Sequence, residues 1–185
     1  MKIIKTKLHD VNIFELDSFS DNRGLFMESY QTNRYKKFGL DYEFVQDNIV
    51  FSEKNVLRGL HYQLENPQGN LVQCIIGEIF DIAVDIRKDS PTFGEWVGFI
   101  LNQNNKRQLF IPPGFAHGYN VLSNECVVIY KCTNYYSKDD EYGIIWNDPL
   151  LNIKWKGNSF IISEKDLNNP TIKNAVLPKY GTKNE

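Results

Sequence analysis

Two histidines lie in segments whose neighbouring residues could carry out proton chemistry. His61 follows Arg58 by three residues in the mostly apolar run VLRGLHYQ, and His117 follows a Pro-Pro-Gly turn in PPGFAHGYN. A neutral imidazole can accept a proton near neutral pH, and an arginine supplies a lasting positive charge. A buried cation beside a titratable ring is costly unless a ligand or a reaction needs both. A base next to an anion-binding group would account for the pair, although His61 taken alone is better explained as a hydrogen-bonded core histidine, and the same reading is open for His117.

A metal centre is not predicted from these histidines. The segment PPGFAHGYN resembles the second motif of the cupin superfamily, whose fold is a small jelly-roll barrel and whose members often bind a metal through a closely spaced histidine pair. Here the position two residues after His61 is Gln63, and the third histidine, His9, lies in the N-terminal segment. Two isolated histidines are a poor ligand set for a transition metal. We therefore expect a cupin-like barrel without a catalytic metal.

The elements that must position these residues are mostly strands. In FDIAVDIR, Phe80, Ile82, Val84 and Ile86 fall on one face, and the other face carries two aspartates. That alternation has the period of a β-strand, and NLVQCIIGEIF and CVVIYKCTNYY are similar runs separated by turn residues. Strands at this spacing predict a sandwich or a barrel. Two short helices are expected, over residues 33–38 and from Ser163, and the final KYGTKNE is expected to fray.

Composition limits the class of protein. The 185 residues are enough for one sizeable core, so we expect a single domain over residues 1–185, with a helical or irregular segment from about residue 163. The formal net charge of -2 gives no sequence-wide attraction to nucleic acid or an anionic membrane. No apolar run approaches the length of a membrane span, and the start lacks an apolar signal core. Three cysteines without a CxxC spacing indicate reduced thiols and a cytoplasmic protein.

Several longer segments, in this order, resemble the dTDP-4-dehydrorhamnose 3,5-epimerases. They are DNRGLFMESY, FVQDNIVFSEKNVLRGLHYQ, GEIFDIAVDIRKDSPTFGEWVG, NKRQLFIPPGFAHGYNVLS, YKCTNYYS, WNDPLLNIKW and SEKD. The resemblance implies a mainly β, cupin-like jelly-roll barrel with a few short helices. It also implies inversion of C3 and C5 of a nucleoside-diphosphate 4-keto-6-deoxy sugar, without a cofactor. Both carbons lie next to the ketone, so the reaction needs a base, an acid on the opposite face of the ring and donors near the C4 oxygen.

The resemblance also assigns roles to individual residues. His61 matches the base, Asp166 matches the carboxylate that orients it, and Tyr130 matches the acid, whose phenol would need a lowered pKa. Asp81 or Asp85 could instead be the partner of His61, with Asp166 preferred. The remaining matches are substrate contacts: Arg23, Phe26, Glu28, Gln46, Asn48, Arg58, Asn70, His117, Tyr136, Glu141 and Lys165, of which Tyr136 would stack on the nucleotide base. Family members resemble homodimers in which N-terminal strands join the neighbouring sheet.

The chain departs from the family at Asn70. The family usually has a lysine in the segment that reads QGNLV here, and its ammonium stabilises the enolate. Asparagine can donate a hydrogen bond but brings no charge. The alternatives are therefore an epimerase of C3 only, an enzyme for GDP-linked 4-keto-heptoses, a ketoisomerase that moves the keto group between C3 and C4, or a sugar-nucleotide-binding cupin without catalysis.

Overall fold

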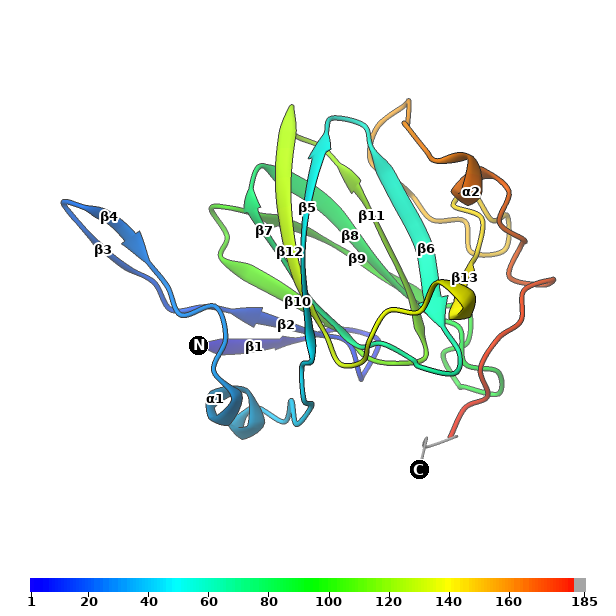
Figure 1. Ribbon diagram of the computed structural model, residues 1–185, viewed down its shortest axis with the longest axis horizontal. Helices are drawn as coiled ribbons and strands as arrows, with labels where there is room; N and C mark the ends of the chain where they lie inside the picture. The colour runs from blue at the N-terminus through cyan, green and yellow to red at the C-terminus, as the bar shows by residue number, and fades with distance from the viewer. Residues whose placement is uncertain (182–185) are drawn as a thin grey trace.

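Antiparallel strands are the main secondary structure in the computed structural model, which describes residues 1–181 (Figure 1). One six-stranded sheet has the order β1 (Lys2–Lys5), β2 (Asn12–Glu15), β10 (Arg107–Ile111), β7 (Asn70–Ile76), β12 (Glu125–Cys132) and β5 (Gln46–Glu53). A five-stranded sheet has the order β13 (Glu141–Gly143), β6 (Leu57–Gln63), β11 (Phe115–Val121), β8 (Glu78–Asp85) and β9 (Trp96–Asn102). A hairpin of β3 (Phe19–Asp21) and β4 (Gly24–Phe26) stands apart. The mainly β architecture predicted from the sequence is confirmed.

The two larger sheets face each other across the main core. Residues of this core occur at every second position of each strand, because successive side chains of a strand point to opposite faces. Val72 and Val128 enter it from the six-stranded sheet, and Ile79 and Leu101 enter it from the five-stranded sheet. The alternation predicted in residues 80–87 is confirmed, with one addition: both faces of β8 are buried, since Phe80, Ile82, Val84 and Ile86 belong to a second core.

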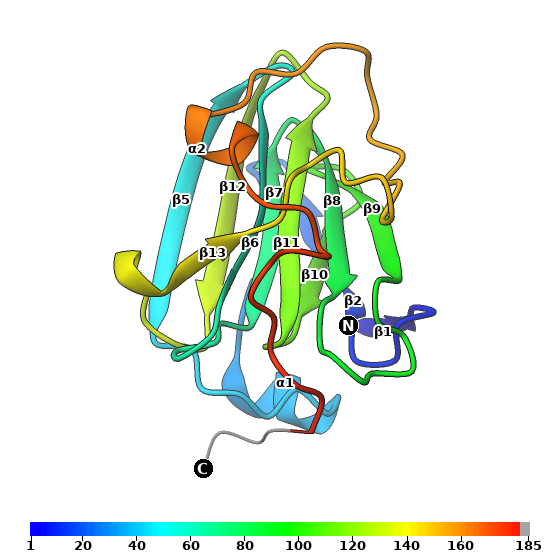
Figure 2. The ribbon, with the colours of Figure 1, turned by 90° about the vertical axis from the view of Figure 1, so that its right-hand side faces the viewer.

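That second core covers the outer face of the five-stranded sheet. Ile144, Leu151, Ile172 and Leu177, from the chain that follows β13, pack against this face. Figure 2 shows this late part of the chain running across the outside of the sheet. The 3-10 turn η1 (Lys138–Asp140) precedes β13. A third cluster, around Tyr35 of α1 (Thr32–Lys37), covers part of the outer face of the six-stranded sheet.

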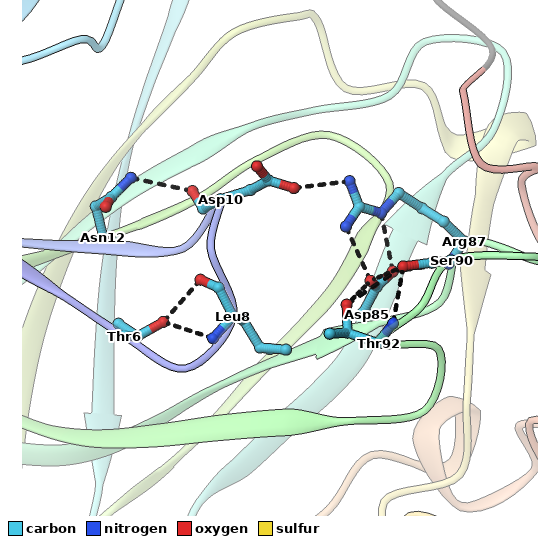
Figure 3. A network of polar contacts seen from close by, with 8 residues as sticks. All are labelled: Thr6, Leu8, Asp10, Asn12, Asp85, Arg87, Ser90 and Thr92. Atoms are coloured by element: carbon cyan, nitrogen blue, oxygen red, sulfur yellow. Dashed lines mark hydrogen bonds and ion pairs between the residues drawn. The ribbon is translucent and has the colours of Figure 1, made fainter.

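A partly buried arginine ties together segments distant in sequence at one end of the barrel. Arg87 donates to both carboxylate oxygens of Asp85, at 2.9 and 2.8 Å, and to Asp10 at 3.0 Å (Figure 3). The hydroxyls of Ser90 and Thr92 each donate to Asp85 at 2.6 Å. These bonds outweigh the effect of burial, which alone would raise the pKa of Asp85, so this pKa lies below its ordinary value. The network links the N-terminal loop to the β8–β9 turn.

The same arginine holds part of the chain that was predicted to fray. The Arg87 guanidinium lies 4.5 Å from the centre of the Phe115 ring and 5.1 Å from that of Tyr180. The Tyr180 amide donates to the Lys88 carbonyl at 2.8 Å. The prediction of a frayed tail is therefore wrong for Lys179 and Tyr180, because a cation–π contact and a backbone bond hold Tyr180 and a β-bridge joins Lys179 to Lys88. Residues 182–185 of the predicted tail lie outside the described residues.

The β3–β4 hairpin projects away from the barrel as an arm (Figure 1). Its aromatic side chains are exposed, Phe19 by 65% and Phe26 by 67%. The apolar residues Ile49 (64%) and Phe51 (74%), on the outer face of edge strand β5, are also exposed. No helix within residues 1–181 is long and apolar enough to cross a membrane.

Candidate active site

A cavity of about 530 Å³ opens between the two sheets. Its walls come from β5, β6, β7, β11 and β12, together with the chain around α2 (Glu164–Leu167). Figure 2 shows α2 and β13 on the side of the molecule where β6 lies. Nine of the residues selected from the sequence line this one cavity: Arg58, His61, Asn70, His117, Tyr130, Tyr136, Glu141, Lys165 and Asp166.

His61 and Asp166 form a close pair in this cavity. The His61 Nε2 lies 2.6 Å from Asp166 Oδ1, and the second carboxylate oxygen accepts the Gly59 amide at 3.2 Å. The Asp166 side chain is only 5% exposed. Burial raises its pKa, but the hydrogen bonds from His61 and Gly59 outweigh burial, so the pKa of Asp166 lies below its ordinary value. The arrangement leaves His61 Nδ1 as the ring nitrogen not engaged by Asp166.

The predicted helix start at Ser163 is confirmed and positions Asp166. The Ser163 hydroxyl accepts the Asp166 amide at 3.1 Å, which is the geometry of a helix N-cap. Upstream, Ile161 exchanges backbone bonds with Asn55 (2.8 Å) and Leu57 (2.9 Å), so this segment lies alongside the start of β6. Asp166 therefore reaches His61 across 105 residues of sequence.

Two glycines allow the histidine-bearing strands to approach closely. In the antiparallel β6–β11 pair, His61 lies opposite His117. A Cβ at Gly59 would lie 2.6 Å from the Gly118 Cα, and a Cβ at Gly118 would lie 2.7 Å from the Arg58 carbonyl oxygen. No real Cβ tolerates such distances, so only glycine fits at either position. The close contact brings both imidazoles to one wall of the cavity.

His117 has its own buried carboxylate. Its Nε2 lies 2.6 Å from Asp81 Oδ1 of β8, the neighbouring strand. Asp81 is fully buried, and its Oδ2 has no hydrogen-bond partner among the described residues. Of the two alternatives that the sequence left open for His61, Asp81 thus contacts the other histidine, and Asp85 belongs to the Arg87 network. The cavity wall carries two histidine–carboxylate pairs.

Tyr130 faces the cavity from the opposite sheet. It lies on β12, opposite Asn48 of β5 and Val72 of β7. From the sequence we expect surroundings that lower the pKa of its phenol, and this expectation is wrong. Burial raises the pKa of Tyr130, and the nearby Arg58 only partly opposes the rise. Tyr130 is therefore a neutral proton donor at neutral pH, while Lys131 points to the other face and pairs with Asp47 at 2.8 Å.

Arg58 is exposed rather than buried, contrary to the expectation from its apolar segment. Its guanidinium donates to the Ser52 hydroxyl, from Nε at 3.3 Å and from a terminal nitrogen at 3.2 Å. The other arginines in the described part of the chain, Arg23, Arg34, Arg87 and Arg107, each pair with a carboxylate, whereas Arg58 pairs with none there. A guanidinium in a cavity without a carboxylate partner is suited to bind an anion.

A chain of polar contacts borders the cavity near its rim. The Tyr136 hydroxyl donates to Glu141 Oε2 at 2.7 Å, and Lys165 forms an ion pair with the same oxygen. Burial raises the pKa of Glu141, but the hydrogen bonds from Lys165 and Tyr136 lower it by more. The pKa of Glu141 therefore lies below its ordinary value. The Tyr136 amide donates to Gln46 Oε1 at 2.9 Å, which joins Gln46 to this group. Half of the Tyr136 surface is exposed and free for stacking.

Asn70 lies in the cavity wall at the end of β7. Its amide nitrogen is 3.4 Å from the Cys132 sulfur, and the Asn48 amide approaches the same sulfur at 3.4 Å. Gln46 in turn donates to Asn48 at 3.1 Å. Burial raises the pKa of the Cys132 thiol to about 11, so the thiol stays protonated near neutral pH. This part of the wall offers neutral amides and no cation.

Three selected residues lie away from the cavity of their own chain. Arg23 folds back on Asp21 in the arm, with a closest approach of 2.6 Å, and Phe26 is exposed on the same hairpin. Glu28 pairs with Arg34 of α1 at 3.2 Å. In Figure 1 the arm and α2 lie on opposite sides of the barrel.

Some residues that line the cavity were not predicted from the sequence. Tyr119 and Gln68 were not selected, and Ser163 was selected only as a helix cap. The signal for Tyr119 was present, because it follows His117 by two residues on a strand and so shares its face. No group of three or more histidine, cysteine or acidic side chains within residues 1–181 could hold a metal ion.

Comparison with known proteins identifies the family. A model of the dTDP-4-dehydrorhamnose 3,5-epimerase family matches residues 5–174. The dTDP-4-dehydrorhamnose 3,5-epimerase of Shigella flexneri is 55% identical over 170 residues, which cover 91% of this chain and 94% of that protein. The chain belongs to the dTDP-4-dehydrorhamnose 3,5-epimerase family. Its activity is accordingly that of an isomerase, a dTDP-4-dehydrorhamnose 3,5-epimerase of dTDP-rhamnose biosynthesis.

Solved structures agree with this family assignment. The Legionella pneumophila dTDP-6-deoxy-D-glucose-3,5-epimerase in complex with dTDP-4-keto-L-rhamnose superimposes with a TM-score of 0.95. It is 47% identical, and the match covers 97% of this chain and 98% of that one. The 3'-monoepimerase ChmJ from Streptomyces bikiniensis, in complex with dTDP-quinovose, has a TM-score of 0.89 at 28% identity, over 95% of this chain and 92% of that one. The cupin-like barrel predicted from the sequence is confirmed.

Proposed function

We propose that this chain acts on dTDP-4-dehydro-6-deoxyglucose, with His61 as the base and Tyr130 as the acid. The observation that supports these roles is their placement on opposite sheets, His61 on β6 and Tyr130 on β12, around one cavity. Epimerisation needs proton removal from one face of the sugar and proton delivery to the other. A base and a neutral phenol on facing walls meet that need.

In this proposal each step of the epimerisation is carried out by particular residues of the cavity. His61, oriented by Asp166, removes the proton next to the C4 ketone, and the electron pair moves to the C4 oxygen as an enolate. Asn70 and His117 supply hydrogen bonds to the sugar oxygens, and Tyr130 returns a proton to carbon from the opposite face. Once His61 has released its proton to solvent and Tyr130 has taken one up from solvent, repetition at the second carbon gives the product with C3 and C5 inverted. Arg58 binds the diphosphate, with Gln46, Asn48, Tyr136, Glu141 and Lys165 around the nucleotide.

The arm suggests that a second copy of the chain completes each cavity. Exposed Phe26 on the arm and exposed Phe51 on edge strand β5 are apolar surfaces that a homodimer would cover. In this proposal the arm crosses to the partner and brings Arg23, Phe26 and Glu28 to the partner's cavity. We further propose that residues 1–185 are a single domain and that it works in the cytoplasm, since its three cysteines are free.

Solvent deuterium uptake tests the reaction. The substrate is incubated with the enzyme in deuterated buffer, with dTDP- and GDP-linked 4-keto sugars compared by NMR. Exchange at C3 and C5 of the dTDP sugar is expected, with almost none for His61→Ala although that variant still binds dTDP. Exchange at C3 alone would favour a C3-epimerase, the second candidate, which the neutral Asn70 and the similarity to a 3'-monoepimerase support. No exchange with any sugar would indicate a binding module.

Complementation between subunits tests the dimer. Arg23→Ala carries an intact cavity and a defective arm, and His61→Ala carries the reverse. If the arm acts on the partner, mixing the two inactive variants creates one intact site per mixed dimer and restores activity. His61→Ala mixed with Asp166→Asn is the matched control, since every cavity then has a defect. No recovery in the first mixture would place the arm outside the partner's site.

A further inference from the structure

Tyr119 holds a buried hydroxyl that nothing in the described chain satisfies. The residue is only 4% exposed, lies on β11 two positions after His117, and contributes to the cavity wall. Its hydroxyl makes no hydrogen bond of normal length and angle within residues 1–181, although the Ser52 hydroxyl lies close enough to lower its pKa. A buried hydroxyl without a partner destabilises the folded state, so such groups usually have a function that explains them.

The neighbours of this hydroxyl are hydrogen-bond donors. Arg58 lies opposite Tyr119 in the β6–β11 pair, and Ser52 of β5 accepts from the Arg58 guanidinium. Burial raises the pKa of the Tyr119 phenol, and the nearby Arg58 and Ser52 oppose the rise without cancelling it. Tyr119 is therefore protonated near neutral pH and can donate a hydrogen bond. Two hydroxyls, from β5 and β11, thus lie beside Arg58, the one arginine of residues 1–181 that lacks a carboxylate partner.

We infer that the Tyr119 hydroxyl, together with Arg58 and Ser52, binds an oxygen of the substrate's diphosphate. This inference rests on the proposed function, because it takes a nucleoside diphosphate as the ligand. An anionic oxygen is the acceptor that this donor set favours, since hydrogen bonds to charged groups are about twice as strong as neutral ones. Tyr119 is then a binding residue for the diphosphate, and its contact is the same in the ground state and the transition state.

The contact has opposite consequences for the free and the bound protein. In the free protein the hydroxyl is a buried polar group without a partner, so removing it should leave the thermal midpoint equal or higher. In the complex the hydroxyl donates to an anion, so removing it should weaken binding. A purely structural tyrosine would behave in the reverse way, with a lower midpoint and unchanged affinity.

Tyr119→Phe tests the inference, because it removes only the hydroxyl. We expect dTDP to bind roughly ten- to a hundredfold more weakly by calorimetry, the range for losing one hydrogen bond to a charged group. Thymidine, which has no phosphate, should bind as tightly as to the wild type, by ligand-observed NMR. In turnover assays KM should rise while kcat stays near the wild-type value.

Tyr35→Phe is the matched control. Tyr35 is equally buried, but its hydroxyl donates to Gln108 at 2.5 Å and lies on the outer side of the other sheet. It should lower the thermal midpoint and leave dTDP affinity unchanged.

Two outcomes would overturn the inference. One is an equal effect of Tyr119→Phe on dTDP and thymidine, including no effect on either. The other is a loss seen with dTDP-glucose but not with dTDP, which would place the contact on the sugar. Failure of the proposed reaction is separate, because it would appear as wild-type enzyme that binds dTDP but exchanges no deuterium.

Discussion

Replacing Asp166 by asparagine isolates the role of the carboxylate that contacts His61. The two side chains have nearly the same size, and the oxygen of the new amide can still accept the Gly59 N–H that Asp166 Oδ2 accepts at 3.2 Å. The nitrogen of the new amide then faces His61 Nε2, where Asp166 Oδ1 lies at 2.6 Å in the wild type. Because that nitrogen can only donate, the ring must carry its proton on Nδ1. The nitrogen that should act as the base is then already protonated.

The size of the effect follows from this tautomer argument. Holding a catalytic histidine in the wrong tautomer costs about 10⁴ in rate in the serine proteases, where a carboxylate has the same role. His61 is partly exposed and Asp166 is buried, so water can partly compensate on the ring side only. We therefore expect Asp166→Asn to slow deuterium exchange by about 10³ to 10⁴, which is about 4–5.5 kcal/mol of transition-state stabilisation. KM should change little, since Asp166 contacts no substrate in the proposed site.

The assay is deuterium uptake at C3 and C5 under saturating substrate, followed by NMR. Glu164→Gln is the matched control, because it makes the same acid-to-amide change at an exposed position of the same helix and should keep the wild-type rate. Unfolding curves for both variants show whether the fold is retained. A folded Asp166→Asn enzyme with a rate within about threefold of the wild type would refute the assignment of Asp166 and the tautomer argument with it.

Three further predictions concern Asn70, metal and pH. If Asn70 donates a hydrogen bond to the enolate, Asn70→Ala should slow deuterium exchange at both carbons by about 10²–10³. Asn70→Lys should raise exchange at C5 relative to C3. If NMR gives wild-type exchange rates for Asn70→Ala, Asn70 has no role in the reaction. Turnover should survive prolonged treatment with a strong chelator, and a loss that added metal reverses would contradict the cofactor-free reaction. Because the pKa of Asp166 is lowered on folding, its contribution to stability is complete above the ordinary aspartate pKa of about 3.9 and disappears as pH falls through its lower value in the fold. Denaturant unfolding should therefore show the wild type losing its advantage over Asp166→Asn in strong acid, and an unchanged difference would contradict this sign.

The strands could be predicted from the sequence because their signal is local. Alternation along residues 80–87 fixed which side chains share a face, and both faces were later found in separate cores. The cap at Ser163 was equally local, since its hydroxyl accepts an amide three residues away. Contacts between residues far apart in the sequence could not be predicted in this way. Residue patterns left Asp81, Asp85 and Asp166 open as partners of His61, because a contact across 105 residues depends on the tertiary fold.

Burial caused the two errors of chemistry in the sequence analysis. Arg58 was expected to be buried because its neighbours are apolar, but alternate strand positions can point to a cavity that solvent enters. The pKa of the Tyr130 phenol was expected to be lowered, but the packing around β12 raises it. A sequence gives the types of neighbouring residues but not the amount of water around each group, and that amount decides both outcomes.

The two histidine–carboxylate pairs of the cavity differ in how they are assembled, and the difference bears on function. His117 and Asp81 lie on adjacent strands of one sheet, so the ladder of β11 and β8 fixes their contact. His61 lies on the same sheet, but Asp166 arrives on a segment attached through the backbone bonds of Ile161 and the cap at Ser163. His61, the proposed base, therefore becomes oriented only when this late segment docks against β6. Loosening the segment should reduce proton exchange before it disturbs the barrel, whereas the His117 pair should persist for as long as the sheet is folded.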